Sequence, residues 1–159
     1  MEQSNMTALV SAFARAYHGM HYKVKIYDDP FAKQILTEDE YEQISLHMSK
    51  GIAFFKPDFI GTEEEALQWI VNQQLSPSPL GRAAFNEEKL ANAVQIGSAE
   101  QYLIIAAGYD SFAYRQPEWG SRLEIFEIDH PQTSADKHKH ISAFVDPIPE
   151  NVHFVAADL

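Results

Sequence analysis

The sequence contains no cysteine among its 159 residues, and basic residues are scarce. Without cysteine the chain cannot form a disulfide bond, a thiolate zinc site or a cysteine nucleophile, so its chemistry depends on other side chains. Lysine and arginine number 12 against 23 aspartate and glutamate residues, which gives a formal net charge of −11. This balance repels phosphate backbones and anionic membrane surfaces, so we expect neither nucleic acid nor membrane as a partner.

Long apolar runs are absent as well. No stretch approaches the roughly 18 residues of a membrane-spanning helix, and Met1–Met6 has neither the basic nor the apolar region of a secretory signal, so we expect a cytoplasmic protein. We expect no metal site, because His138 and His140 point to different faces of a helix and His18 and His21 lack a third ligand. A hydrophobic content of 45% allows one core of ordinary domain size.

Residues 1–97 have the apolar spacing of helices, and we predict that they form a helical cap region. Helix-capping residues, glycines and prolines divide this region into segments. The expected elements are a helix from Ser4–Asn5 to Gly19, a helix over 38–50, a helix that begins with the capping box of Thr62 and Glu65, a break at Ser76–Pro79, and a helix over 86–96 closed by Gly97 in the left-handed conformation.

Residues 98–159 alternate between apolar strands and helical segments, which predicts an α/β fold of the Rossmann-like kind. The expected elements are strands at 102–107, 123–128 and 152–156, a short helical segment near 111–116, and a helix over about 131–144 that Pro131 begins. Right-handed crossovers then place three parallel strands in the order 3-2-1. Ligands in such sheets bind beyond the carboxyl ends of the strands.

Three residues follow the three predicted strands and would meet at that edge: Gly108, Asp129 and Asp158. A glycine turn lets the backbone approach a ligand, and an acid 21 positions later can accept hydrogen bonds from two ribose hydroxyls. Each residue alone has an ordinary explanation as a turn, a helix cap or a solvated acid. Their combination predicts a nucleoside site.

Several segments together resemble the S-adenosylmethionine-dependent leucine carboxyl methyltransferase family, which includes polyketide O-methyltransferases. The resemblance covers nearly the whole chain and implies a class I methyltransferase fold with S-adenosyl-L-methionine as cofactor. The matching segments are QYLIIAAGYDSFAYR at 101–115, FEIDHP at 126–131, NVHFVAADL at 151–159, AFARA at 12–16, DDPFA at 28–32, and Gly81–Arg82.

The resemblance also implies roles for individual residues. Gly108 and its turn would lie against the methionine part of the cofactor, and Arg82 would pair with the cofactor's carboxylate. Asp129 would hold the ribose hydroxyls, while Asp158 and Leu159 would meet the adenine edge. These assignments are expectations carried over from the family.

The sequence departs from the family pattern in two respects: one residue of the turn that contains Gly108, and the length of the chain. Ala106 stands where the family usually has the first glycine of Gly-Ala-Gly-x-Asp, and Asp110 is the acid of that motif. The resembling enzymes continue past the third strand, so we expect a truncated form whose first strand has a bare edge. That edge would either pair with a second copy, giving a homo-oligomer, or be covered by the amino-terminal helices.

The implied reaction transfers a methyl group to a carboxylate or a small-molecule hydroxyl by in-line displacement, which depends on alignment more than on acid–base catalysis. No catalytic base is identified, and Arg15 is a candidate for steering an anionic acceptor. Two alternatives remain. One is a non-catalytic interaction or self-association module. The less favoured one is a nicotinamide dehydrogenase, since Ala106–Ser111 lacks two of the glycines that a dinucleotide site needs.

Overall fold

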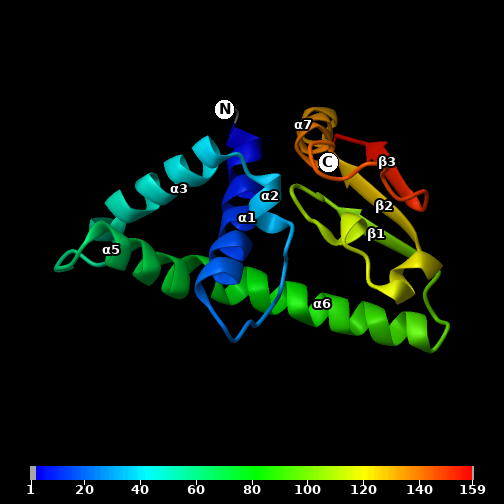
Figure 1. Ribbon diagram of the computed structural model, residues 1–159, viewed down its shortest axis with the longest axis horizontal. Helices are drawn as coiled ribbons and strands as arrows, with labels where there is room; N and C mark the ends of the chain where they lie inside the picture. Colours follow the sequence, from blue (N-terminus) through cyan, green and yellow to red (C-terminus); the bar gives the residue numbers. More distant parts are fainter. Residues whose placement is uncertain (1–2, 159) are drawn as a thin grey trace.

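The computed structural model describes residues 3–158, and it combines a bundle of helices with a three-stranded sheet (Figure 1). The strands are β1 (Gln101–Ile105), β2 (Glu124–Asp129) and β3 (Val152–Ala156). All are parallel, and β2 pairs with both neighbours, so the order is β1-β2-β3. The predicted α/β class, the parallel sheet and the strand order 3-2-1 are confirmed.

The strand register determines which side chains share a face of the sheet. Ile104 lies beside Glu127, which lies beside Phe154, and these side chains are on the face that packs on the rest of the protein. Leu103 lies beside Phe126 on the opposite face. Each strand therefore contributes alternate residues to a covered face and to an outer face.

The helical segments that connect the strands are shorter than predicted. The segment expected near 111–116 consists of a 3-10 turn, η2 (Phe112–Tyr114), and a second turn, η3 (Glu118–Arg122), follows it. Pro131 begins α7 (Pro131–Ile141) as predicted, because the first helical position needs no amide donor. That helix ends three residues before the predicted limit, and residues 142–144 form turns.

The first helices of the chain are α1 (Gln3–His21), α2 (Ala32–Ile35), α3 (Glu38–Lys50), α4 (Ile52–Phe55) and α5 (Glu63–Ile70). Helices α1, α3 and α5 begin close to the positions that the sequence predicts, whereas the short helices α2 and α4 were not predicted. The Thr62–Glu65 capping box is confirmed, and Thr37 with Glu40 forms a second one before α3. The predicted end of α1 at Gly19 is wrong by two residues, since a single glycine within a packed helix costs only about 1 kcal/mol.

The predicted break at Ser76–Pro79 is wrong. A π-helical turn, η1 (Val71–Leu75), leads almost directly into α6 (Pro77–Gln95), so this helix begins nine residues before the predicted Asn86. Both prolines lie in the first turn of α6, where a missing amide removes no intrahelical bond and the fixed φ suits the helix. Gly97 ends the helix with φ of +70°, as predicted, while the Ser98 amide donates to Ala93 O at 2.9 Å.

Helix α1 is central to the molecule. It stands between the α3–α5 hairpin and the sheet, and α6 crosses below it (Figure 1). Residues 12–18 of α1 are all buried, so the helix is covered on every side there. One hydrophobic cluster extends from Phe13 on α1 to Ile125 on β2. The regions 1–97 and 98–159 therefore share a core.

An ion pair lies inside that shared core, between α7 and β2. Lys137 Nζ donates to Glu127 Oε1 at 2.6 Å, and the Tyr114 hydroxyl donates to Glu127 Oε2 at 2.7 Å. The side chains of Lys137 and Glu127 are each 3% exposed. Burial raises the pKa of the Glu127 carboxyl and that of the Tyr114 hydroxyl. These contacts attach α7 and the η2 turn to the middle of the sheet.

Replacing Lys137 by methionine leaves the Glu127 carboxylate buried without its counter-charge. We expect the free energy of unfolding at pH 7, measured by urea titration, to fall by about 3–5 kcal/mol. In this variant, burial holds the pKa of the Glu127 carboxyl above the pKa that it has in the unfolded chain. The variant therefore recovers stability as the pH falls toward the unfolded-chain pKa, and it loses stability as the pH rises above it. Lys139→Met, on an exposed position of α7, is the control and should change stability by less than about 0.5 kcal/mol. Equal losses in both variants would contradict this role of the pair.

Candidate functional site

A cavity of about 1030 Å³ opens at the carboxyl ends of the strands, between α1, α6 and the start of α7. Every described residue that the sequence singled out for the site lines it: Arg15, Arg82, Ala106, Gly108, Asp110, Asp129 and Asp158. Leu159, the remaining candidate, lies outside the described residues. The residues that follow the three strands therefore lie around one cavity. The role of each residue in binding stays a prediction.

Asp129 connects the ends of β1 and β2. Its Oδ2 accepts from the Gly108 amide at 2.6 Å, and its Oδ1 accepts from the His130 amide at 2.7 Å. A carboxylate offers about four lone-pair positions, so each oxygen keeps capacity for a further donor. Asp129 can therefore hold the glycine turn and still receive ligand hydroxyls.

Gly108 is required by its conformation and by its neighbour. Its φ is +47°, and a Cβ placed on it would lie 3.1 Å from the Ala8 Cβ on α1. A side chain at this position would be strained and would also press on α1. The glycine turn and the amino-terminal helix are in direct contact.

Ala106 also has a left-handed backbone, with φ of +53°. It occupies the position of the first glycine in the Gly-Ala-Gly-x-Asp pattern described above, and it lines the cavity. The backbone of this turn thus keeps the conformation that glycine would adopt freely. The Ala106 side chain adds strain at the floor of the cavity.

Arg15 lines the cavity with its side chain 9% exposed. Its Nε donates to Asp29 Oδ2 at 2.8 Å, and its NH2 group donates to the carbonyl oxygen of Tyr109 at 2.6 Å. Its NH1 group donates to Ser11 Oγ at 3.2 Å. These three contacts occupy the guanidinium, and a role in steering an acceptor stays a prediction.

The other charged candidates differ in their surroundings. Asp110 Oδ1 accepts from the Phe112 amide at 2.8 Å, which closes the loop after the glycine turn. Arg82 on α6 is exposed, and no hydrogen bond or ion pair ties its guanidinium to another described residue. Asp158 is exposed at the end of β3. The cavity thus has a cationic side chain on α6 and acids at the strand ends.

Sequence reasoning named Arg15 but missed the other contributions of α1, and it missed those of the start of α7. Thr7, Ser11 and Arg15 line the cavity from positions four residues apart on α1, and His130 and Thr133 line it from α7. The four-residue spacing of polar side chains on an otherwise apolar helix was the available signal, because such residues share a face.

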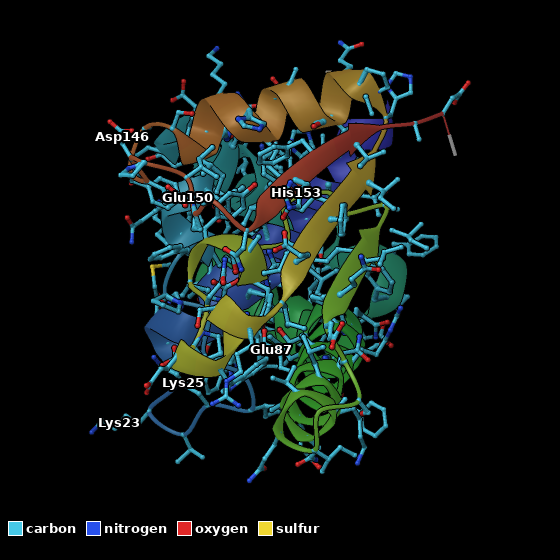
Figure 2. All side chains as sticks on the ribbon, turned by 90° about the vertical axis from the view of Figure 1, so that its right-hand side faces the viewer. Lys23, Lys25, Glu87, Asp146, Glu150 and His153 are labelled. Atoms are coloured by element: carbon cyan, nitrogen blue, oxygen red, sulfur yellow. The ribbon has the colours of Figure 1, made fainter. Side chains whose placement is uncertain are left out.

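A second cluster of charges lies just outside the cavity, beside α6. Arg115 contacts the Tyr27 hydroxyl and the carboxylate of Glu87, and its Nε donates to Ser111 Oγ at 2.9 Å. Figure 2 shows Glu87 directed from α6 toward the segment that follows the glycine turn. Burial raises the pKa of Tyr27, which keeps its hydroxyl protonated as a donor.

Two kinds of feature, a metal-binding cluster and a membrane-spanning helix, are absent from residues 3–158. No three histidine, aspartate or glutamate side chains of this part of the chain come together in a way that could hold a metal ion. No helix in the same range has the length and apolar character needed to cross a bilayer.

Comparison with known proteins identifies the class to which this fold and cavity belong. The family model described as leucine carboxyl methyltransferase matches residues 8–159, so the chain belongs to this family of S-adenosylmethionine-dependent methyltransferases. A candidate S-adenosyl-L-methionine-dependent methyltransferase of Bacillus subtilis (strain 168), YktD, is 40% identical over 160 residues, which cover 98% of this chain and 52% of YktD.

A second relative is the candidate S-adenosyl-L-methionine-dependent methyltransferase Franean1_4929 of Parafrankia sp. (strain EAN1pec). It is 35% identical over 78 residues, which cover 49% of this chain and 24% of that protein. The chain therefore spans at most about half the length of these two relatives. The cofactor implied by the family is S-adenosylmethionine.

Ala106→Gly tests the strain in the turn. A left-handed residue other than glycine costs about 1–2 kcal/mol, and the greater unfolded-state freedom of glycine offsets about 0.4–1 kcal/mol of that gain. We expect thermal or urea unfolding to show a net stabilisation of about 0.5–1 kcal/mol. Ala107→Gly is the matched control, since Ala107 is buried without a positive φ, and it should destabilise by about 1 kcal/mol. A loss of stability in Ala106→Gly would show that the turn is not strained.

Proposed function

We propose that this chain binds S-adenosylmethionine in the cavity at the strand ends and forms part of an O-methyltransferase. The acceptor would be a carboxylate or a hydroxyl of a small molecule. The observation that carries the proposal is the common position of Gly108, Asp129 and Asp158 around one cavity. Family membership supports the choice of cofactor.

The donor and acceptor groups of the cavity fit this cofactor. Asp129 has acceptor capacity left for two ribose hydroxyls, and Asp158 is an exposed acceptor suited to the exocyclic amine of adenine. Arg82 is a cation suited to the carboxylate of the methionine part. Gly108 lets the backbone approach that part closely. In this assignment the cofactor lies across the ends of all three strands.

When bound, the cofactor supplies an electrophilic methyl group. The chain's own residues then bind and orient, because in-line displacement depends on alignment of the acceptor oxygen. A carboxylate acceptor is already ionised at neutral pH and needs no base. Thr7 and Ser11 on α1 and Asn86 on α6 also line the cavity, and they are the candidates for contacts with the acceptor.

Calorimetric titration tests the proposal. Wild-type protein should bind S-adenosylmethionine and its demethylated product and give no heat with a nicotinamide dinucleotide. Asp129→Asn should weaken binding by about tenfold or more, because one carboxylate oxygen becomes a donor and hydrogen bonds to charged groups contribute about 1.5–3 kcal/mol. Asparagine is preferred to alanine because its remaining oxygen can still accept from the Gly108 amide, and the contact that it gives up is the one from the adjacent His130 amide.

Asp58→Asn is the control for this measurement. Asp58 is exposed, does not line the cavity, and loses the same charge, so its affinity should match that of the wild type. If the wild type gives no heat with S-adenosylmethionine and none with its demethylated product, the proposed function is contradicted. Equal affinity in Asp129→Asn would remove Asp129 from the site.

An interaction module is the second candidate function, and the outer face of the sheet favours it. Leu103 is 51%, Ile105 65% and Val155 40% exposed on this face. Figure 2 looks onto the strands here, with His153 on β3 and no helix in front of them. The amino-terminal helices therefore leave this apolar face open. Parallel sheets are usually covered on both faces, and an open one with a free edge favours association.

Light scattering coupled to size exclusion tests self-association. We expect the wild type to form a homodimer through β1 and the outer face, and Leu103→Lys combined with Ile105→Lys to give a monomer, because buried lysines oppose an apolar interface. Ile60→Lys is the control, since Ile60 is 97% exposed away from the sheet, and it should leave the mass unchanged. A monomeric wild type would exclude self-association at the concentration used.

A further inference from the structure

We propose that Asp29 is a positioning residue for the glycine turn and acts on it through Arg15. The proposal rests on the proposed function for its effect on cofactor binding, whereas its effect on the turn is independent of any ligand. Asp29 itself does not line the cavity. Its side chain is fully buried, with 0% exposure, in the loop between α1 and α2.

Asp29 accepts hydrogen bonds on both carboxylate oxygens. Its Oδ2 accepts from Arg15 Nε at 2.8 Å, while its Oδ1 accepts from the amides of Phe31 and Ala32 at 3.1 and 3.2 Å. The Nε of Arg115 lies 3.5 Å from the same Oδ1. One carboxylate thus lies between two arginines and also accepts from the Ala32 amide, at the residue that begins α2.

Arg15 transmits the position of Asp29 to the turn. Its NH2 group donates to the Tyr109 carbonyl at 2.6 Å, and Tyr109 directly follows Gly108. The planar guanidinium fixes the relative directions of its donors, so the bond to Asp29 determines where the bond to Tyr109 points. The Gly108 amide is held from the other side by Asp129. The turn is therefore held between an acid on β2 and a cation on α1.

The contacts of Asp29 are incompatible with a neutral asparagine in its place. Both oxygens of Asp29 face donors, so either orientation of the asparagine amide group would place one donor against another. Among the residues that the structure describes, the same change would leave Arg15 without an ion-pair partner and Arg115 with Glu87 alone, although their side chains are only 9% and 10% exposed. Arg15 would then lose its fixed direction toward Tyr109.

The adjacent residue supplies a matched control. Asp28 is also an aspartate, but its side chain is 61% exposed and pairs with Lys25 at the surface. Asp28→Asn removes the same charge one position away without touching Arg15. Any difference between Asp28→Asn and Asp29→Asn therefore reports on the buried contacts.

The experiment compares wild type, Asp28→Asn, Asp29→Asn and Arg15→Lys at a temperature where circular dichroism shows each to be folded. The first readout is the carbonyl-carbon NMR shift of Tyr109, which moves upfield when the hydrogen bond from Arg15 is lost. The second is the affinity for S-adenosylhomocysteine by calorimetry. Arg15→Lys keeps a cation beside Asp29, but a single ammonium cannot reach both partners, so it tests the step from Arg15 to Tyr109. Asp29→Glu joins the set because it keeps the charge and displaces the carboxylate by one methylene, and an unchanged Tyr109 resonance in this variant would overturn the role of Asp29 even if Asp29→Asn fails to fold.

We expect Asp29→Asn and Arg15→Lys to move the Tyr109 resonance upfield and to weaken binding of S-adenosylhomocysteine by tenfold or more, and Asp28→Asn to change neither. An unchanged Tyr109 resonance in folded Asp29→Asn or Arg15→Lys would overturn the proposal. If the wild type binds no product, the proposed function fails, and the Tyr109 resonance still decides the role of Asp29. Unchanged product affinity despite a moved resonance would overturn the link to cofactor binding.

Discussion

The hydrogen bond from the Gly108 amide to the Asp129 carboxylate, at 2.6 Å, is the contact on which the candidate site depends. Parallel pairing places Ile105 beside Ile128, so β1 and β2 end at the same level, and pairing of Asp129 with Ala156 brings Asp158 to the same edge. A charge-assisted bond in a partly buried turn is stronger than one between neutral groups. The strand register and this bond together determine the cavity floor.

Helix α1 makes the amino-terminal region part of the site and not only its cover. Its apolar residues form the centre of the shared core, while Thr7, Ser11 and Arg15 face the cavity from one side of the helix. Because Ala8 contacts the glycine turn directly, a shift of α1 would move the turn. Packing of the helices and geometry of the strand ends are therefore coupled, and a change in the cap can alter binding at the sheet.

The outer face of the sheet shows the opposite situation. Leu103 and Ile105 are exposed there, although the inner face of the same strand packs on the core. Parallel sheets are usually covered on both faces, so these exposed apolar side chains form a surface whose burial against another surface would be favourable.

The local signals of the sequence determined the strand order, the capping box at Thr62, the left-handed Gly97 and the identity of the strand-end residues, because each depends on neighbouring residues or on a repeated pattern. The same signals misplaced the start of α6, since prolines can begin a helix as well as end one. Only the tertiary structure decided that Arg15 joins Asp29, 14 positions away, to Tyr109, 94 positions away. Contacts over such separations arise from the packing of whole elements, and no local pattern of residues encodes them.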